Sequence, residues 1–484
     1  NGRFHSDWCS MMYPRLQLAR NLLSDDGVIF ISIDDNEVDS LRKICDEVFG
    51  EVNFISQFIW EKKKKPSFLN KNLGVKIEYI ICFCKNRIST GAFSVDLTEE
   101  GKKYPFNNAG NGLKDLTFPV NSVFFNIPDG IVVKQDMSEG RIVTRLLNNI
   151  EIKNGRNANE FTLQGEWRYS QEKLNEIVEN EEVIIISKIP FRPNHVKTGG
   201  EIKKIHNLLT LNNYEMLGTN EDADNEQVKL FGYSYFDYTK PTGLLKFLIK
   251  ALTYNDKNSI VLDFFSGSAT TADAVMQLNA EDGGNRKFIM VQLPEATDEK
   301  SEANKAGYKN ICEIGKERIR RAGKKIEEEL QAKSTKGELF KNEEEVKTVD
   351  TGFRVLKLDS TNMKDVYYSA GEYSQQLLLD LESNIKEDRT DLDLLYGVLL
   401  DWGVSLSLPH ISETIDGKKV HFVNETDLVA CFEEEVNEDI VREIAKRKPL
   451  RVVFRDSCFS SSPEKINVSE IFKTLSPDTT IKVI

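Results

Sequence analysis

A carboxylate followed by a run of small residues is the clearest chemical feature of this sequence. The stretch VLDFFSGSATTADAV (261–275) predicts a buried strand that ends at Asp263, a tight turn, and a helix that begins near residue 269. In an open α/β sheet, ligands bind at the carboxyl ends of the strands, which is where Asp263 stands. Gly267 lets the backbone approach a ligand closely, and Ser268 is small enough not to obstruct it. The first N–H groups of the helix would donate hydrogen bonds to that ligand.

A second acid narrows the kind of ligand. Glu295 ends the next predicted strand, KFIMVQLPE (287–295), and an acid there is placed to accept hydrogen bonds from both hydroxyls of a ribose. The turn carries neither the Gly-Lys-Ser/Thr of a P-loop nor the G-x-G-x-x-G dinucleotide pattern. These residues therefore predict a nucleoside site without an essential pyrophosphate. The structural alternative is a plain strand–turn–helix unit in which Asp263 only caps the turn.

The surrounding pattern predicts the elements that hold this turn. Helices are expected over 8–23, 36–49, 240–253 and 311–331, and strands over 27–34, 54–63 and 76–86. The strand 27–34 is nearly continuous in apolar residues, so it is expected to be buried on both faces. The charged helix 311–331 is expected to be solvated over most of its surface. The fold class is therefore α/β, interrupted from about residue 99 to 230 by an irregular inserted module.

Composition bounds the class of protein. The 484 residues are 40% hydrophobic and 29% charged, as in a globular protein. The sequence contains no apolar run long enough to span a membrane and no secretory leader pattern, so a cytoplasmic protein without a membrane segment is expected. The seven scattered cysteines fit reduced thiols, and Cys82 and Cys84 are interpreted as core residues of a strand, so no metal site is predicted. The net charge of −13 argues against wholesale wrapping of nucleic acid but permits a local basic groove.

The turn also resembles a known cofactor loop. DFFSGSATTADAV is similar to the S-adenosyl-L-methionine loop of amino-methylating DNA methyltransferases, D-x-F-x-G-S-G-T-T, and departs from it at Ala269, where the helix start is expected to tolerate alanine. FDYTKPTGLL (236–245) resembles the Lys-Pro element that lines the methionine end of the cofactor in that family. The resemblance implies S-adenosyl-L-methionine as cofactor, with these binding residues: Asp263, Phe264, Phe265, Gly267, Ser268, Thr270, Glu295, Lys240 and Pro241.

Other stretches resemble one subfamily along nearly the whole chain. GEWRYSQEKLNEIVENEEVIII (165–186), DTGFRVLKLDS (350–360) and KPLRVVFRDSCFSS…INVSEIFKTLSPDTTIKVI (448–484) are similar to the modification subunit of type III restriction–modification systems. That subunit is a beta-class adenine-N6 DNA methyltransferase with a Rossmann-like sheet in permuted motif order, an inserted target-recognition module and a C-terminal α+β domain. The resemblance implies double-stranded DNA as substrate, a homodimer of modification subunits, and a helicase–nuclease restriction subunit as partner.

The resemblance also implies domain boundaries. They are an N-terminal part of the methyltransferase domain (1–98), a target-recognition insert (99–235), a cofactor-binding part (236–333), a linker (334–349) and a C-terminal domain (350–484). The stretch 54–86 resembles the paired strands beside the family's target-base pocket. Lys62, Lys63, Lys64, Lys65 and Trp60 are the candidate DNA contacts there; the alternatives are a solvated loop for the lysines and a core position for the tryptophan.

One motif of the family is missing. These enzymes hold and polarise the adenine amine with an Asp-Pro-Pro-Tyr loop, yet no two of the thirteen prolines are adjacent. No catalytic residue is therefore assigned, and the sequence is expected to be truncated before that loop and to be inactive alone. The alternative is a non-catalytic DNA-binding or assembly subunit of the restriction complex. A methyltransferase for RNA or small molecules is disfavoured by the long insert.

Overall fold

The computed structural model describes residues 2–66, 72–335, 348–364, 385–459 and 462–484. The chain divides into two compact units, Asn1–Phe353 and Arg354–Ile484. The division falls a few residues after the expected boundary at 349/350, because Thr351 and Phe353 still contact the long helix of the first unit: Thr351 Oγ1 donates to Glu327, and Phe353 lies 5.7 Å under the Arg320 guanidinium. Residues 336–347 of the expected linker lie outside the described residues.

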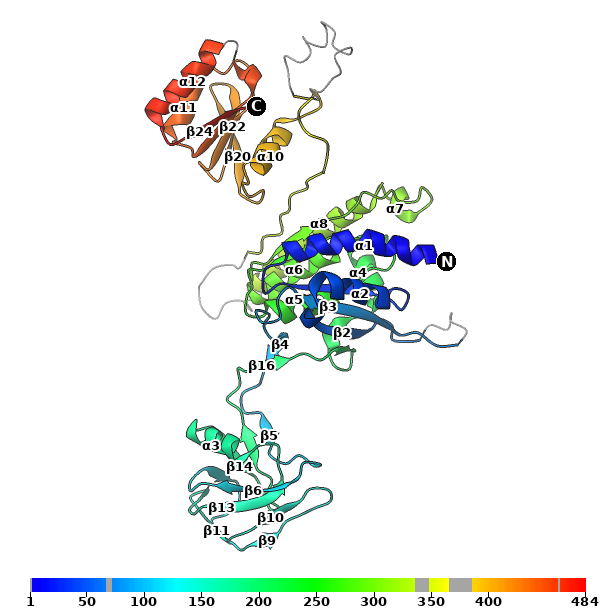
Figure 1. The fold of residues 1–484 in the computed structure, drawn as a ribbon, viewed down its shortest axis with the longest axis vertical. Helices are drawn as coiled ribbons and strands as arrows, with labels where there is room; N and C mark the ends of the chain where they lie inside the picture. Colours follow the sequence, from blue (N-terminus) through cyan, green and yellow to red (C-terminus); the bar gives the residue numbers. More distant parts are fainter. Residues whose placement is uncertain (1, 67–71, 336–347, 365–384, 460–461) are drawn as a thin grey trace. The chain divides into compact units, whose positions relative to one another are not determined.

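The N-terminal part of the first unit is a mixed sheet, antiparallel except at one edge strand, with helices packed on it. Its elements are α1 (Gly2–Leu22), β1 (Val28–Ile33), α2 (Val38–Phe49), η1 (Glu51–Asn53), β2 (Phe54–Glu61) and β3 (Ile77–Cys84), and the sheet order is β1-β3-β2-β17 with β17 at Leu208–Leu209. Leu16, Leu41 and Phe83 meet in one core between α1, α2 and β3 (Figure 1). β1 is only partly buried, because it is the edge strand of this sheet rather than a central one.

Residues 103–196 form sheets and a core of their own. The strands are β5 (Lys103–Pro105), β6 (Leu113–Phe118), β7 (Val123–Phe125), β8 (Gly130–Val132), β9 (Gln135–Asp136), β10 (Thr144–Leu146), β11 (Ile150–Lys153), β12 (Arg156–Asn157), β13 (Phe161–Glu166), β14 (Val183–Ile186) and β15 (Asn194–Val196), with one helix, α3 (Gln171–Glu179). Phe118 and Phe161 stack with ring centroids 4.9 Å apart in that core. The flanking strands β4 (Ser94–Leu97) and β16 (Ile202–Lys204) pair with each other. This core is narrower than the expected insert 99–235, because β17 pairs with β2 and the helix that follows packs elsewhere.

The candidate loop lies in the last part of the first unit. Its elements are η2 (Glu215–Leu217), α4 (Asn220–Phe231), α5 (Thr242–Thr253), β18 (Ile260–Asp263), α6 (Thr270–Asp282), β19 (Lys287–Met290), α7 (Glu302–Lys305) and α8 (Ile311–Thr335). β18 and β19 pair in parallel, so their carboxyl ends meet at one edge. Val261 and Phe288 pack against Ile249 and Val275 of α5 and α6, while α6 also packs on α8 (Figure 1).

The second unit is a five-stranded sheet with helices on both faces. Its elements are α10 (Asp391–Asp401), β20 (His410–Ile415), β21 (Lys418–Val423), β22 (Leu428–Cys431), α11 (Glu438–Lys446), β23 (Arg451–Phe454), η3 (Asp456–Cys458), α12 (Ser462–Leu475) and β24 (Thr480–Val483), in the sheet order β20-β21-β22-β23-β24. Leu395 of α10 packs on one face, and Ile440 of α11 and Phe472 of α12 pack on the other.

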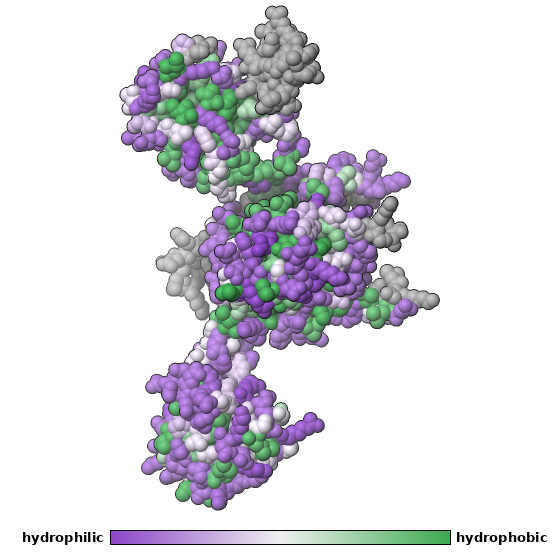
Figure 2. Space-filling model, in the orientation of Figure 1, coloured by the Kyte–Doolittle hydropathy of each residue, from purple (hydrophilic) through white to green (hydrophobic). Residues whose placement is uncertain are grey.

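Two further expectations about these elements are corrected. The strand predicted over 287–295 ends at Met290, so Glu295 follows the strand rather than ending it. The helix 311–331 is not solvated over most of its surface, because Ile314, Arg318 and Ile319 are buried. The face drawn in Figure 2 is mainly hydrophilic, with apolar side chains in small groups. No helix in the part of the chain that the structure describes is long and apolar enough to span a membrane.

Candidate functional site

Asp263 fixes the loop between β18 and α6. Its Oδ1 accepts a hydrogen bond from the Phe265 N–H at 3.1 Å, and its Oδ2 accepts one from the Thr271 hydroxyl at 2.6 Å. One carboxylate therefore closes the turn at its start and ties it to the first turn of the helix. This geometry agrees with the structural alternative for Asp263, and it also gives the loop a defined shape for a ligand.

Two residues of the loop adopt left-handed backbone conformations. Gly267 has a φ of 50°, and a Cβ added there would stand 3.1 Å from the ring of Phe236, so a larger residue would be strained and the ring would have to shift. Ala269 has a φ of 60° and is 2% exposed. The expectation that this position tolerates alanine as an ordinary helix start is corrected, because a left-handed conformation costs alanine roughly 1–2 kcal/mol.

Substitution of Ala269 by glycine and by valine should have different effects on stability. Glycine relieves the left-handed strain but gives up a buried methyl group worth about 0.8 kcal/mol, so Ala269→Gly should be nearly neutral. Valine adds β-branching to a left-handed, buried position, so Ala269→Val should cost about 2–3 kcal/mol. Urea unfolding of the two variants measures both values, and equal stabilities would show that the backbone at 269 is not left-handed.

Most loop amides already have acceptors. The N–H groups of Ser266, Gly267 and Ala269 donate to Val291 O at 3.2 Å, Gln292 Oε1 at 2.8 Å and Ser266 O at 2.7 Å. Sequence reasoning did not find Gln292, whose side chain holds the glycine amide. Ala269 supplies no side-chain cap to α6. These three loop amides are therefore engaged within the protein, and the first N–H groups of α6 are candidate donors for a ligand.

The aromatic and acidic candidates lie in different environments. Phe264 packs against the core formed by α1 and α2, whereas the Phe265 side chain is 54% exposed. Glu295 is exposed after β19, and its backbone N–H donates to Leu293 O at 2.8 Å. Phe265 and Glu295 thus follow the carboxyl ends of two paired parallel strands, with their side chains open to solvent.

Ser268 and Thr270 point into the protein. They are 3% and 5% exposed, and the Arg318 guanidinium of α8 lies 3.4 Å from the Ser268 hydroxyl and donates to the Thr270 hydroxyl at 2.9 Å. Their side chains therefore face Arg318 rather than solvent and support the loop from inside the protein. Sequence reasoning missed Arg318, although it falls in the apolar stripe of α8 with Ile314 and Ala322.

Lys240 and Pro241 occupy the start of α5. Pro241 is buried, and Lys240 pairs with the Glu78 carboxylate, with its Nζ 5.0 Å from the centre of the Trp60 ring. Burial opposes ionisation of Glu78, yet Lys240 and Lys62 outweigh it and hold its pKa below the ordinary value. The ion pairs are therefore lost only as the pH falls through that lowered pKa. Lys240 is committed to this pair rather than extended toward the loop.

The structure places the candidate DNA contacts in different environments. Trp60 is 1% exposed and donates its indole N–H to Gly218 O at 3.2 Å, so it offers no face to DNA and agrees with the core alternative. Lys62 pairs with Glu78 at 2.9 Å and Lys64 with Asp222 at 2.7 Å. Lys63 and Lys65 line a cavity of about 580 Å³, whose wall also carries the carboxylates of Glu221, Asp224 and Asp237.

That cavity lies beside the candidate loop. Thr239 forms part of its wall, and the Thr239 hydroxyl is 3.4 Å from the Ser268 hydroxyl. Tyr238, also in the wall, is 89% exposed at a φ of 59°. The buried Gln227 holds this segment, because its amide donates to Phe236 O at 2.8 Å and to Thr239 Oγ1 at 2.9 Å.

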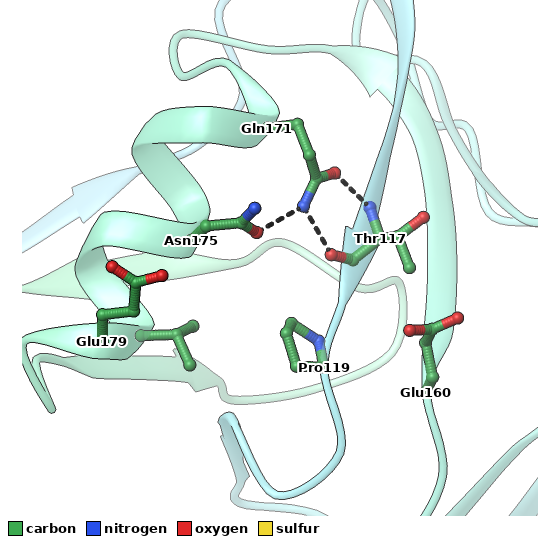
Figure 3. A pocket seen from close by; sticks show the side chains of 7 residues that line it. Thr117, Pro119, Glu160, Gln171, Asn175 and Glu179 are labelled. Carbon is green, nitrogen blue, oxygen red and sulfur yellow. Dashed lines mark hydrogen bonds between the residues drawn. The ribbon is translucent and has the colours of Figure 1, made fainter.

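A second cavity, of about 480 Å³, lies in the module 103–196 (Figure 3). The Gln171 side chain accepts from Thr117 N at 2.8 Å and donates to Thr117 O at 2.9 Å, so its amide is already engaged. Glu160 and Glu179 line the cavity from opposite sides, Glu160 from the chain just before β13 and Glu179 from α3 (Figure 3). Within the described ranges, no group of three or more His, Cys, Asp or Glu side chains could hold a metal ion.

Comparisons with known proteins identify the family of the chain. A family model described as DNA methylase, covering N6 and N4 methyltransferases, matches residues 2–324. The chain is 37% identical over 324 residues to the type III restriction-modification enzyme StyLTI Mod subunit of Salmonella typhimurium strain LT2, covering 66% of this chain and 46% of that protein. It is 33% identical over 354 residues to the EcoPI Mod subunit of Escherichia phage P1, covering 66% and 50%.

A type II relative aligns over a similar share of the chain. The type II methyltransferase M.KpnI of Klebsiella pneumoniae is 27% identical over 329 residues, covering 64% of this chain and 72% of that protein. The chain spans about half the length of the two Mod subunits that it matches. The family match runs from α1 into α8 and includes the braced loop after β18. The chain therefore belongs to the N6/N4 DNA methylase family.

Proposed function

We propose that this chain binds S-adenosyl-L-methionine at the loop 263–271 and serves as the donor-binding part of a DNA methyltransferase that acts on adenine N6. The observation that carries the proposal is the Asp263 brace at the carboxyl end of β18, inside the region matched by the DNA methylase family. A parallel strand followed by a tight turn and a helix is where open α/β sheets bind their ligands.

The exposed residues of the loop fit a nucleoside donor. The open ring of Phe265 can pack on an adenine, and the exposed carboxylate of Glu295 can accept from ribose hydroxyls. The donors at the start of α6 can bind the polar part of the molecule. The bound donor would supply an electrophilic methyl group on a sulfonium, and these residues would hold and orient it.

The proposal for the methyl acceptor rests on the relatives and on a motif that the sequence lacks. Relatives named type III Mod subunits support DNA adenine as the acceptor, although the family covers N6 and N4 chemistry. No Pro-Pro pair occurs among the 484 residues, so an Asp-Pro-Pro-Tyr loop is not among them. We infer that polypeptide outside these residues supplies that loop, and that the 484 residues alone bind the donor without transferring methyl groups. A second modification subunit and a restriction subunit are the proposed partners.

A second candidate function is a non-catalytic DNA-binding or assembly subunit. The separate unit Arg354–Ile484 favours it, since that unit has its own core and lies beyond the family match. The two candidates differ in donor binding: an assembly subunit needs none. Donor binding by the 484 residues therefore supports the first candidate and removes the need for the second.

Product analysis tests the proposed reaction. The complete protein would be incubated with labelled S-adenosylmethionine and duplex DNA, and the DNA would then be digested to nucleosides. We expect N6-methyladenine. N4-methylcytosine would show that the acceptor is cytosine N4 instead. Label in RNA or small molecules but not in DNA would contradict a DNA methyltransferase.

We also propose that the cavity beside the loop faces DNA, with Lys63 and Lys65 near phosphates and the exposed Tyr238 ring against a base. Replacing both lysines with glutamine should make the negative slope of log K for DNA binding against log salt concentration shallower by about 2. Each lost phosphate contact removes roughly 0.9 from the size of the slope. Salt titration of DNA binding measures the slope. Lys287→Gln is the control, because Lys287 is exposed at the amino end of β19, opposite the loop. Equal slopes in all variants would place the DNA elsewhere.

A further inference from the structure

We propose that Arg318 is a positioning residue that holds the methyl-donor loop in its binding conformation; this inference rests on the proposed function. Arg318 lies on α8, and its side chain is 1% exposed. Nothing in the resemblance to the cofactor loop pointed to it, because it stands about fifty positions later in the sequence.

The guanidinium joins four helices and the loop. Its Nε donates to Asp273 Oδ2 of α6 at 3.2 Å, its Nη1 to Thr270 Oγ1 at 2.9 Å, and its Nη2 to Thr242 Oγ1 of α5 at 3.0 Å. Ser268 Oγ lies 3.4 Å from Nη1, and Glu226 Oε2 of α4 lies 3.6 Å from Nη2. The helices α4, α5, α6 and α8 therefore meet at this one group.

Charge and shape explain why an arginine stands here. A buried cation is costly unless it is paired, and the buried Asp273 carboxylate supplies the opposite charge. The acceptors lie in different directions around a planar fork, which five N–H donors can reach at once. A lysine ammonium is a compact point charge with three donors, and it cannot reach the same acceptors from one position.

The contacts bear directly on the strained part of the loop. Ser268 and Thr270, which Arg318 contacts, flank Ala269 in its left-handed conformation. One turn earlier on α8, a Cβ on Gly315 would stand 3.3 Å from the Gly267 carbonyl oxygen, so glycine there lets the helix lie against the loop. Strained conformations persist only where the surroundings hold them, and α8 provides that hold through Gly315 and Arg318.

The chain offers a matched control for a substitution at Arg318. Arg286 is also buried, at 3% exposure, and it also pairs with α6, through Asp282 at 2.9 Å. Its other partners are Thr253, at the end of α5, and Asn279 of α6. Arg286 therefore holds the far end of α6 and has no contact with the loop among its hydrogen bonds. Arg318→Lys and Arg286→Lys make the same chemical change at the two ends of one helix.

Two measurements on the 484-residue chain test the proposal. Amide hydrogen exchange of residues 264–272 without ligand should become about tenfold faster in Arg318→Lys and stay unchanged in Arg286→Lys after correction for global stability. Calorimetric titration with S-adenosylmethionine should show a roughly 10- to 100-fold weaker Kd for Arg318→Lys alone, the range found for outer partners that orient metal ligands.

The outcomes separate this inference from the proposed function. The two variants could instead change loop exchange and Kd equally, each in proportion to its loss of stability. Arg318 would then be only a structural residue, and the proposal would be overturned. Parental loop exchange in Arg318→Lys would overturn it as well. If the parent chain binds no S-adenosylmethionine while loop exchange still depends on Arg318, the proposed function fails and the loop-holding role stands.

Discussion

Gly243→Ala is expected to destabilise the first unit by about 3 kcal/mol, near the upper end of what one extra buried methyl group costs. Gly243 lies in the first turn of α5, and a Cβ there would stand 1.8 Å from the carbonyl oxygen of Met216. The obstructing atom belongs to the backbone of η2, so no side-chain rotation can remove the overlap. Chemical denaturation followed by tryptophan fluorescence would measure the loss.

The same change at another glycine provides the control. Gly91 has no atom within 4 Å of its added Cβ and no left-handed φ, so Gly91→Ala should be neutral or slightly stabilising. A Gly243→Ala protein as stable as Gly91→Ala would show that η2 does not pack on α5 as described. That result would also show that the Lys240–Pro241 segment does not lie beside the loop 263–271.

Asp263→Ala is expected to weaken S-adenosylmethionine binding by about 100-fold, equivalent to ~2.7 kcal/mol. The change removes both acceptors that shape the loop and leaves the Phe265 N–H and the Thr271 hydroxyl without their partner. A net loss of about 1 kcal/mol per hydrogen bond should also appear in the free energy of unfolding. Titration calorimetry and denaturation of the same samples would give both values.

Asp256→Ala is the matched control for Asp263→Ala. Asp256 also closes a turn, accepting from Asn258 N at 3.0 Å and Ser259 Oγ at 2.8 Å, but it does so before β18 rather than after it. We expect a similar loss of stability with a parental Kd. If Asp256→Ala weakened donor binding as much as Asp263→Ala, the effect would come from stability and not from the shape of the loop.

Local patterns were sufficient to predict the elements around the loop. The apolar run before Asp263 and the small residues after it predicted β18, the turn and α6, and helical spacing predicted α5. These signals are local, because a buried strand and an amphipathic helix each carry their own periodicity. The family resemblance at Asp263, Phe265 and Gly267 agrees with the DNA methylase match.

Contacts between distant residues could not be predicted in the same way. Trp60 is buried in a core with Leu217 and Leu244, and Gly218, 158 positions away, accepts its N–H. No local pattern reports these partners. The left-handed φ of Ala269 depends on how α8 lies against the loop. Arg318 was hidden by the many charges of its helix, and only its place in the apolar stripe distinguished it. The end of β19 was overestimated because Gln292 turns to hold Gly267.

Direct titration of the 484-residue chain with S-adenosylmethionine is the most direct test of the central claim, which is that the loop 263–271 is a methyl-donor site. We predict binding of one donor per chain, competed by S-adenosylhomocysteine and weakened by Asp263→Ala but not by Asp256→Ala. A folded chain that binds no S-adenosylmethionine, or that binds it equally well with Asp263→Ala, would contradict the account.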